Sequence, residues 1–176
     1  MDNNLAVIYL SLLITLLSAT AWFIFRQIIK TRQLESTFSK LQKKLSKEKG
    51  TALEYYQLGS IYLDKKLFSQ AVTQLQNALK APDLEGEENI ALVYNALGFA
   101  YAALEQYDLA IRQYKEALKY KPDYVTALNN LGFVYERKKL TSQALEVYEE
   151  ALKYEPNNQT AKKRAESLRK RVVMPA

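Results

Sequence analysis

The segment YNALGFAY at residues 94–101 recurs thirty-four residues later as LNNLGFVY at residues 128–135. When residues 91–124 are aligned with residues 125–158, thirteen residues are identical and no gap is needed. An earlier copy begins at Ala52, and an insert around LEGEEN (84–89) lengthens the step from Gly59 to Gly98 to thirty-nine residues. Because units that repeat at this period bury their apolar faces against one another, the pattern predicts a solenoid.

Thirty-four residues is the period of the tetratricopeptide repeat (TPR), a helix–turn–helix unit. Small residues recur where its two helices would cross, tyrosines where the space around the crossing must be filled, and prolines where the second helix must end. These repeat-core signature positions are Gly59, Tyr62, Ala71 and Ala78 in the first copy, Gly98, Tyr101, Ala110, Ala117 and Pro122 in the second, and Gly132, Tyr135, Ala144, Ala151 and Pro156 in the third.

The last repeat needs a polar cap, and residues 157–171 fit a helix with Ala161, Ala165 and Leu168 on one side and basic residues elsewhere. We therefore predict an all-α TPR solenoid of three repeats and a capping helix, behind an N-terminal transmembrane helix. The predicted segments are a membrane anchor (1–25), a basic amphipathic juxtamembrane helix (26–50), TPR 1 (51–83), TPR 2 (91–124), TPR 3 (125–158), and a capping helix with a basic tail (159–176).

The predicted anchor, residues 5–25, contains no charged residue. A helix of this length covers roughly 30 Å, the hydrocarbon thickness of a bilayer. Ala19-Thr20-Ala21 would also fit a signal-peptide cleavage site. However, no Lys or Arg precedes the apolar run, which continues through Phe25, so the sequence favours an uncleaved anchor.

Residues 26–49 hold eight basic and two acidic residues, a net charge of +6. Basic residues stay on the cytoplasmic side of a membrane, which predicts that the repeats lie there or on the equivalent organellar side. Within this segment Leu34, Phe38, Leu41 and Leu45 form one apolar helical stripe. The stripe could dock on the following domain, pair with another helix in self-association through residues 33–49, or lie on anionic lipid.

Composition argues against catalysis and metal binding. The 176 residues include no Cys and no His, which excludes thiolate and imidazole chemistry. The acidic residues are scattered along helix surfaces, and no Gly-rich phosphate loop is present. Residues 50–161 hold eleven basic and fifteen acidic residues, which disfavours nucleic-acid binding. We predict neither an enzyme nor a bound cofactor or metal.

In TPR proteins the first helices of the repeats line a concave groove that binds protein partners. The corresponding positions here are largely apolar or amide-bearing: Leu53, Tyr56, Ser60 and Leu63, then Leu92, Asn95, Phe99 and Ala102, then Thr126, Asn129, Phe133 and Glu136. Asn95 and Asn129 could bind an extended peptide backbone or only solvate their own helices. Phe99 and Phe133 could be contact anchors or inter-repeat packing.

A groove of this composition does not match the TPR proteins that grip the C-terminal carboxylate of chaperones. Those proteins carry Lys, Arg and Asn at set positions of the groove. The matching positions here are Tyr56, Ser60, Ala96, Thr126 and Asn130, and only the last is an amide. A carboxylate clamp is therefore not expected.

The whole chain resembles a small membrane-anchored TPR family of cyanobacteria and plastids. The resemblance rests on KEKGT at residues 47–51 before the first repeat, on LGSIYLDKK at 58–66, and on one N-terminal span followed by three repeats. It implies a non-enzymatic role in assembly or maintenance of photosystem I at the thylakoid membrane, with photosystem I subunits or assembly factors as partners. It also implies repeats that face the stroma or cytoplasm.

Two other functions fit an anchored solenoid. One is an organellar preprotein import receptor, which would bind presequence peptides directly. The other is a self-associating membrane organiser that uses residues 33–49.

Overall fold

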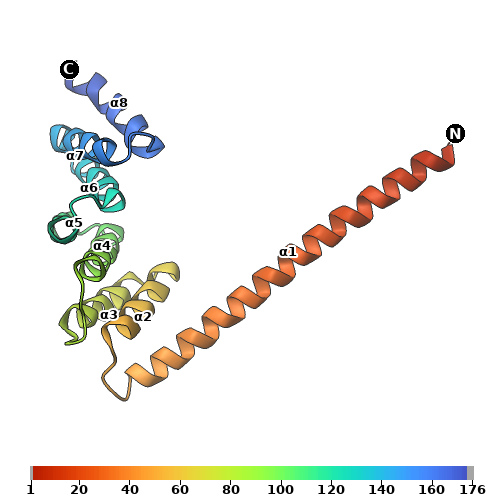
Figure 1. Cartoon of the computed structure of the whole chain (residues 1–176), viewed down its shortest axis with the longest axis horizontal. Coiled ribbons are helices and arrows are strands. Elements are labelled where there is room, and N and C mark those ends of the chain that lie inside the picture. Colours follow the sequence, from red (N-terminus) through yellow and green to blue (C-terminus); the bar gives the residue numbers. More distant parts are fainter. Residues whose placement is uncertain (1, 174–176) are drawn as a thin grey trace. The chain divides into compact units, whose positions relative to one another are not determined.

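The computed structural model describes residues 2–173, with side-chain burial for residues 7–171. Every regular element in that range is an α-helix, which confirms the predicted all-α class. The helices are α1 (Asp2–Leu45), α2 (Ala52–Asp64), α3 (Phe68–Lys80), α4 (Glu87–Ala103), α5 (Tyr107–Tyr120), α6 (Val125–Arg137), α7 (Thr141–Tyr154) and α8 (Gln159–Val173) (Figure 1). The chain divides into two compact units, one carrying α1 and the other carrying α2–α8.

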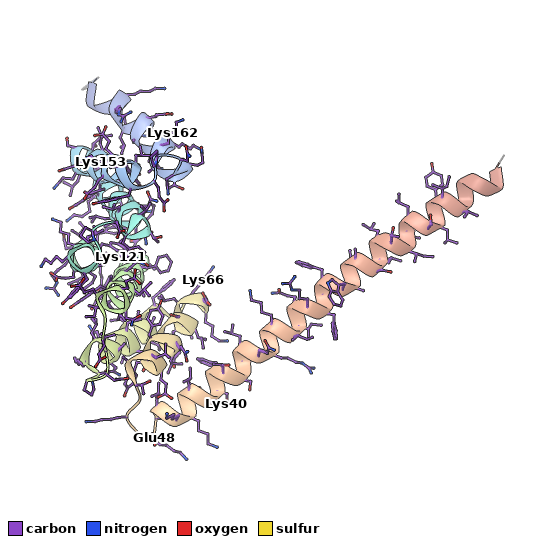
Figure 2. All side chains as sticks on the ribbon, in the orientation of Figure 1. Lys40, Glu48, Lys66, Lys121, Lys153 and Lys162 are labelled. Atoms are coloured by element: carbon purple, nitrogen blue, oxygen red, sulfur yellow. The ribbon has the colours of Figure 1, made fainter. Side chains whose placement is uncertain are left out.

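Helix α1 is the one helix among the described residues that is long and apolar enough to cross a membrane. Its most apolar window has a mean hydropathy of 2.1. The hydroxyls of Ser11 and Thr15 donate to the carbonyls of Ile8 and Leu12, at 2.8 and 2.9 Å, so these polar groups are satisfied within the helix. The helix runs without interruption through residue 25, into the basic segment that contains Lys40 (Figure 2).

In the second unit, consecutive helices pack against each other from α2 to α8. The helices of each pair are joined by the same tight turn, with Lys66, Glu105 and Lys139 at φ of 58–59°. After each of these residues the next amide donates to the carbonyl five residues back, as Leu67 does to Tyr62 at 2.8 Å. This is a Schellman motif, which satisfies the last carbonyls of the first helix.

Prolines mark the turns between repeats. Pro82, Pro122 and Pro156 each occupy the second position of a four-residue turn that a backbone hydrogen bond closes, at 3.2, 3.1 and 3.0 Å. Proline is favoured at this position of the turn because its φ is already fixed near −65°. Pro82 comes one position early in its repeat because α3 has 13 residues, whereas α5 and α7 have 14.

The two helices of each repeat cross at a glycine of the first helix. A Cβ placed on Gly98 or Gly132 would lie 2.7 or 2.6 Å from the ring of Tyr114 or Tyr148, closer than real Cβ atoms approach. At Gly59 the facing side chain is Leu75, at 2.9 Å. The paired alanines of the second helices complete the close contact with no exposed surface: Ala71, Ala78, Ala110, Ala117, Ala144 and Ala151.

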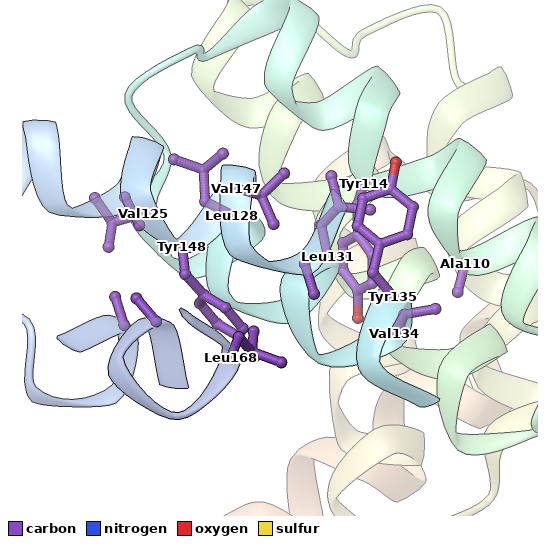
Figure 3. Close-up of a cluster of buried hydrophobic side chains, with 14 residues drawn as sticks. Ala110, Tyr114, Val125, Leu128, Leu131, Val134, Tyr135, Val147, Tyr148 and Leu168 are labelled. Atoms are coloured by element: carbon purple, nitrogen blue, oxygen red, sulfur yellow. The ribbon is translucent and has the colours of Figure 1, made fainter. Parts of the chain in front are cut away.

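Around the later crossings lies one continuous apolar core. Tyr114 and Tyr148 are almost fully buried, together with Leu128, Leu131 and Val134 of α6 (Figure 3). Of the signature tyrosines, Tyr62 and Tyr135 are buried and Tyr101 is half-buried; Pro122 and Pro156 are exposed.

Helix α8 covers the open end of this core. Ala161, Ala165 and Leu168 are buried, while the other described side chains of the helix are exposed. Its first turn is capped by Asn158, whose Oδ1 accepts from the Ala161 amide at 3.0 Å. A single helix with one buried stripe closes the solenoid, as a capping element must.

The crossings predict unequal effects of adding one methyl group. Gly132→Ala should destabilise the protein by about 1–3 kcal/mol, because the buried ring of Tyr148 cannot move away without disturbing the core. Gly59→Ala should have a smaller effect, since the flexible side chain of Leu75 can adjust. Thermal and urea unfolding followed by circular dichroism measures both. Equal stabilities for Gly132→Ala and wild type would contradict this description of the crossing.

The two buried tyrosines predict alkaline unfolding. Burial raises the pKa of Tyr114 and of Tyr148 above the ordinary value near 10, and for Tyr148 the hydrogen bond to Glu136 adds to the increase. For each tyrosine the pKa in the folded state exceeds the pKa in the unfolded state. The contribution of the neutral, buried hydroxyl to the free energy of unfolding is therefore complete below pH 10 and is lost as the pH rises above 10. We expect Tyr148→Phe to flatten the decline in unfolding free energy above pH 10. An unchanged slope would exclude Tyr148 as a source of that decline.

Candidate protein-binding groove

The first helices of neighbouring repeats lie next to each other, α2 beside α4 and α4 beside α6. We call the surface that carries the twelve predicted groove residues the first-helix face. Its exposed members are Leu53, Leu92, Phe99, Thr126 and Phe133. Its half-buried members are Tyr56, Ser60, Leu63, Asn95, Ala102, Asn129 and Glu136. All twelve side chains are at least partly accessible, so none belongs wholly to the core.

Three of the twelve residues line a pocket of about 360 Å³ between α2, α4 and the segment that joins repeats 1 and 2. We call it the acidic pocket. Its apolar walls come from Leu53, Tyr56, Leu84 and Leu92, and its carboxylates from Asp83 and Glu85. Among the described residues, no Lys or Arg lines it.

Local capping interactions fix the acidic pocket in place. The side chain of Thr51 accepts from the Glu54 amide at 3.2 Å, and the Glu54 carboxylate accepts from the Thr51 amide at 3.1 Å. Asp83 accepts the next amide, that of Ala52, with its two carboxylate oxygens at 3.0 and 3.2 Å. These bonds satisfy the first amides of α2 and tie the inter-repeat segment to the start of that helix.

The insert that interrupts the repeat period has a visible structural role. It adds a first turn to α4, which begins at Glu87, four residues before repeat position one at Ala91. Glu88 in this turn pairs with Lys121 of the next inter-repeat turn, and this hydrogen bond lowers the pKa of Glu88. The insert thus extends the first-helix face and carries acidic residues to its edge.

Three further predicted residues line a second pocket, of about 290 Å³, between repeats 2 and 3. We call it the aromatic pocket. Phe99, Ala102 and Phe133 form much of its wall, and Tyr107 and Arg137 close one side. The Arg137 guanidinium lies 5.6 Å from the centre of the Tyr107 ring and 3.5 Å from a Glu105 oxygen. Phe99 and Phe133 are 46% and 43% exposed, so they are available as contact anchors.

The asparagines of the face make hydrogen bonds that join separate helices and turns of the solenoid, a use that neither sequence interpretation included. Asn95 donates to the Tyr124 hydroxyl at 3.4 Å and accepts from Asn130 at 3.1 Å. Asn129 donates to Asn158 at 3.4 Å, while its Oδ1 is buried without a partner in the described part of the chain. Burial raises the pKa of Tyr124, whose hydroxyl is already neutral at physiological pH.

Glu136 also has partners within the protein. It accepts from the Tyr148 hydroxyl at 2.9 Å and lies 3.7 Å from Arg164 of α8. The predicted groove residues therefore have different uses. Six of them line the two pockets, and Asn95, Asn129 and Glu136 hold helices together. The other three, Ser60, Leu63 and Thr126, line neither of these pockets.

Sequence reasoning missed the residues that come from outside the first helices. Asp83 and Glu85 belong to the inter-repeat segment, and Tyr107 belongs to a second helix. The insert was the available signal for Glu85, since a lengthened step must place extra residues at the edge of the face, whereas Asp83 is the last residue of predicted TPR 1. Nothing in the repeat pattern marks Tyr107 as part of a pocket.

Stacked helix pairs with a pocketed first-helix face define this molecule as a TPR protein-interaction scaffold. Tetratricopeptide-repeat family models match residues 55–82 and 125–158, and a TPR-repeat model matches residues 98–139. Protein ycf37 of Cyanophora paradoxa is 40% identical over 127 residues, which cover 72% of this chain and 73% of that relative. The chain belongs to the ycf37 family of TPR proteins.

A plant relative extends the comparison. The tetratricopeptide repeat domain-containing protein PYG7, chloroplastic, of Arabidopsis thaliana is 37% identical over 128 residues. The match covers 73% of this chain and 42% of that longer protein. Relatives thus occur in plastid-bearing organisms, and one of them is chloroplastic by name.

Solved structures show the same fold. MamA matches with a TM-score of 0.70 at 22% identity, over 82% of this chain and 85% of MamA. The TPR domain of Arabidopsis OM64 matches with a TM-score of 0.61 at 25% identity, over 68% of this chain and 94% of that domain. At this level of identity the likeness supports the architecture and not a shared ligand.

The two hydrogen bonds of Asn95 predict that this residue is needed for stability. Asn95→Ala removes its bonds to Tyr124 and Asn130, and we expect a loss of about 1–2 kcal/mol in unfolding free energy. Thr126→Ala is the control, because this exposed side chain of the same face should change stability by less than about 0.5 kcal/mol. Urea unfolding compares the two. Equal stability of both variants would show that the asparagine bonds contribute little.

Proposed function

We propose that this protein is a membrane-tethered scaffold that binds photosystem I subunits or assembly factors and so assists assembly or stability of photosystem I. The observation that carries the proposal is the combination, in one chain, of a pocketed first-helix face with a helix able to cross a membrane. Photosystem I as the target rests on the family resemblance of KEKGT and LGSIYLDKK. The plastid relatives support a thylakoid setting.

The tether explains how a small binding face could be effective. A protein held at the membrane surface meets membrane-bound partners at a high effective concentration, so moderate affinity is sufficient. The +6 charge of residues 26–49 favours the cytoplasmic or stromal side for the repeats. On that side the face would meet the exposed parts of membrane subunits as they assemble.

Non-covalent binding is the chemistry that the face offers. Its exposed Phe and Leu side chains supply apolar contact, and the two pockets supply positions for individual partner side chains. The shifted pKa values in the described residues belong to tyrosines and to surface ion pairs. We therefore propose a non-enzymatic role, in which the scaffold releases its partner unchanged.

Affinity purification from gently solubilised native membranes tests this function. The tagged full-length protein should recover photosystem I subunits, identified by mass spectrometry. The Phe99→Ala, Phe133→Ala double variant should recover about tenfold less, because two exposed anchors are removed from one face. Helicity should remain unchanged, since neither ring is buried.

Tyr154→Ala provides the matched control, because it removes an equally exposed aromatic ring from the second helix of repeat 3. It should retain wild-type recovery. Equal recovery by all three proteins would exclude the aromatic pocket as the binding site. Translocase components in place of photosystem subunits would favour the import receptor, and recovery of the protein alone would favour the self-associating organiser.

A further inference from the structure

We propose that the acidic pocket selects a Lys or Arg side chain of the partner, with the aliphatic stem against Leu53 and Leu92 and the cationic head beside Glu85. The inference deepens the proposed function by naming the chemistry of the bound segment. It depends on that function only in requiring that the first-helix face binds a protein.

The apolar walls of the pocket suit a long side chain. Leu53 is 62% exposed and Leu92 is 39% exposed, although both are leucines that line one pocket. The methylene stem of Lys or Arg packs well on such a surface while its charge stays at the rim. The ring of Tyr56 lies in the same wall and can accept a cation on its face.

The charge of the pocket also favours a basic side chain. Several surface carboxylates of the repeats have a cation: Glu88 pairs with Lys121, Glu105 with Arg137 and Asp108 with Lys138. Asp83 and Glu85 take part in no ion pair within the described residues. The pocket is therefore a place where negative charge lies against apolar surface without a counter-charge from the described part of the chain.

The two carboxylates contribute differently. Asp83 accepts the Ala52 amide at the start of α2, so part of its charge is balanced by the positive end of that helix. Glu85 is exposed, and within the described residues its carboxylate takes part in no hydrogen bond or ion pair that would hold it away from a ligand. Glu85 thus provides most of the attraction for a cation, while Asp83 fixes the wall behind it.

This arrangement disfavours other partners. A terminal carboxylate, an acidic peptide, an anionic lipid headgroup or a nucleic-acid phosphate would be repelled by Asp83 and Glu85. A wholly apolar segment would leave the Glu85 carboxylate without a partner, whereas Asp83 would keep its bonds to the Ala52 amide. A segment that places a basic residue in the acidic pocket and an apolar residue in the aromatic pocket satisfies both sites.

Selection of phage-displayed random dodecapeptides on the full-length protein in detergent micelles tests the inference. Wild-type protein should enrich Lys and Arg about two- to fivefold over the input library, the range that a partly screened ion pair supports. Glu85→Lys should abolish this enrichment. Glu87→Lys is the control, since it makes the same charge change two residues away on an exposed side chain outside the pocket.

The possible results separate clearly. Loss of basic peptides with Glu85→Lys but not with Glu87→Lys supports the pocket. Enrichment of acidic or uncharged peptides, retention of no peptide, or an equal loss in both variants would overturn it. The selection contains no photosystem I. Recovery of its subunits from native membranes can therefore succeed while this inference fails, and basic peptides can be selected even if the native partner belongs to another complex.

Discussion

The solenoid depends on the missing Cβ at one position of each first helix. At Gly98 and Gly132 a tyrosine ring from the second helix occupies the space where a side chain would be, and at Gly59 a leucine does. This close approach brings the alanines of the second helices to complete burial and sets the distance at which the next pair must pack. These three crossings therefore determine the geometry of the first-helix face and of the two pockets described in it.

The first-helix face differs between its two repeat junctions because the sequence departs from the regular repeat at one of them. A strictly periodic array would present similar surfaces between repeats 1 and 2 and between repeats 2 and 3. The insert breaks that symmetry by adding a turn to α4 and by carrying Glu85 to the edge of one pocket. The other junction keeps the regular spacing and has Phe99 and Phe133 at equivalent repeat positions. One face therefore combines an acidic and an aromatic pocket, which can distinguish the two ends of a bound segment.

The sequence predicts the fold well because close packing restricts residue size at fixed intervals, and Gly132 or Ala144 can be recognised from spacing alone. It predicts the turns within repeats less well, since the left-handed position is filled by Lys66, Glu105 and Lys139, where glycine would be the usual signal. The asparagine bonds are also hidden, because Asn95 finds its partners 29 and 35 residues away. Pockets depend on such tertiary neighbours, so their walls cannot be derived from periodicity.

Tethering and pocket chemistry together suit a partner that must be released. A groove with micromolar affinity is largely occupied when its partner is confined nearby at about millimolar effective concentration. The same affinity allows dissociation within a short time once the partner is drawn into a larger complex. Selectivity then cannot come from a large buried area, and must come from a few positions where a wrong side chain meets repulsion. In our proposal the Glu85 carboxylate beside exposed leucines provides such a position, because it repels anionic segments and stays without a partner beside a purely apolar one.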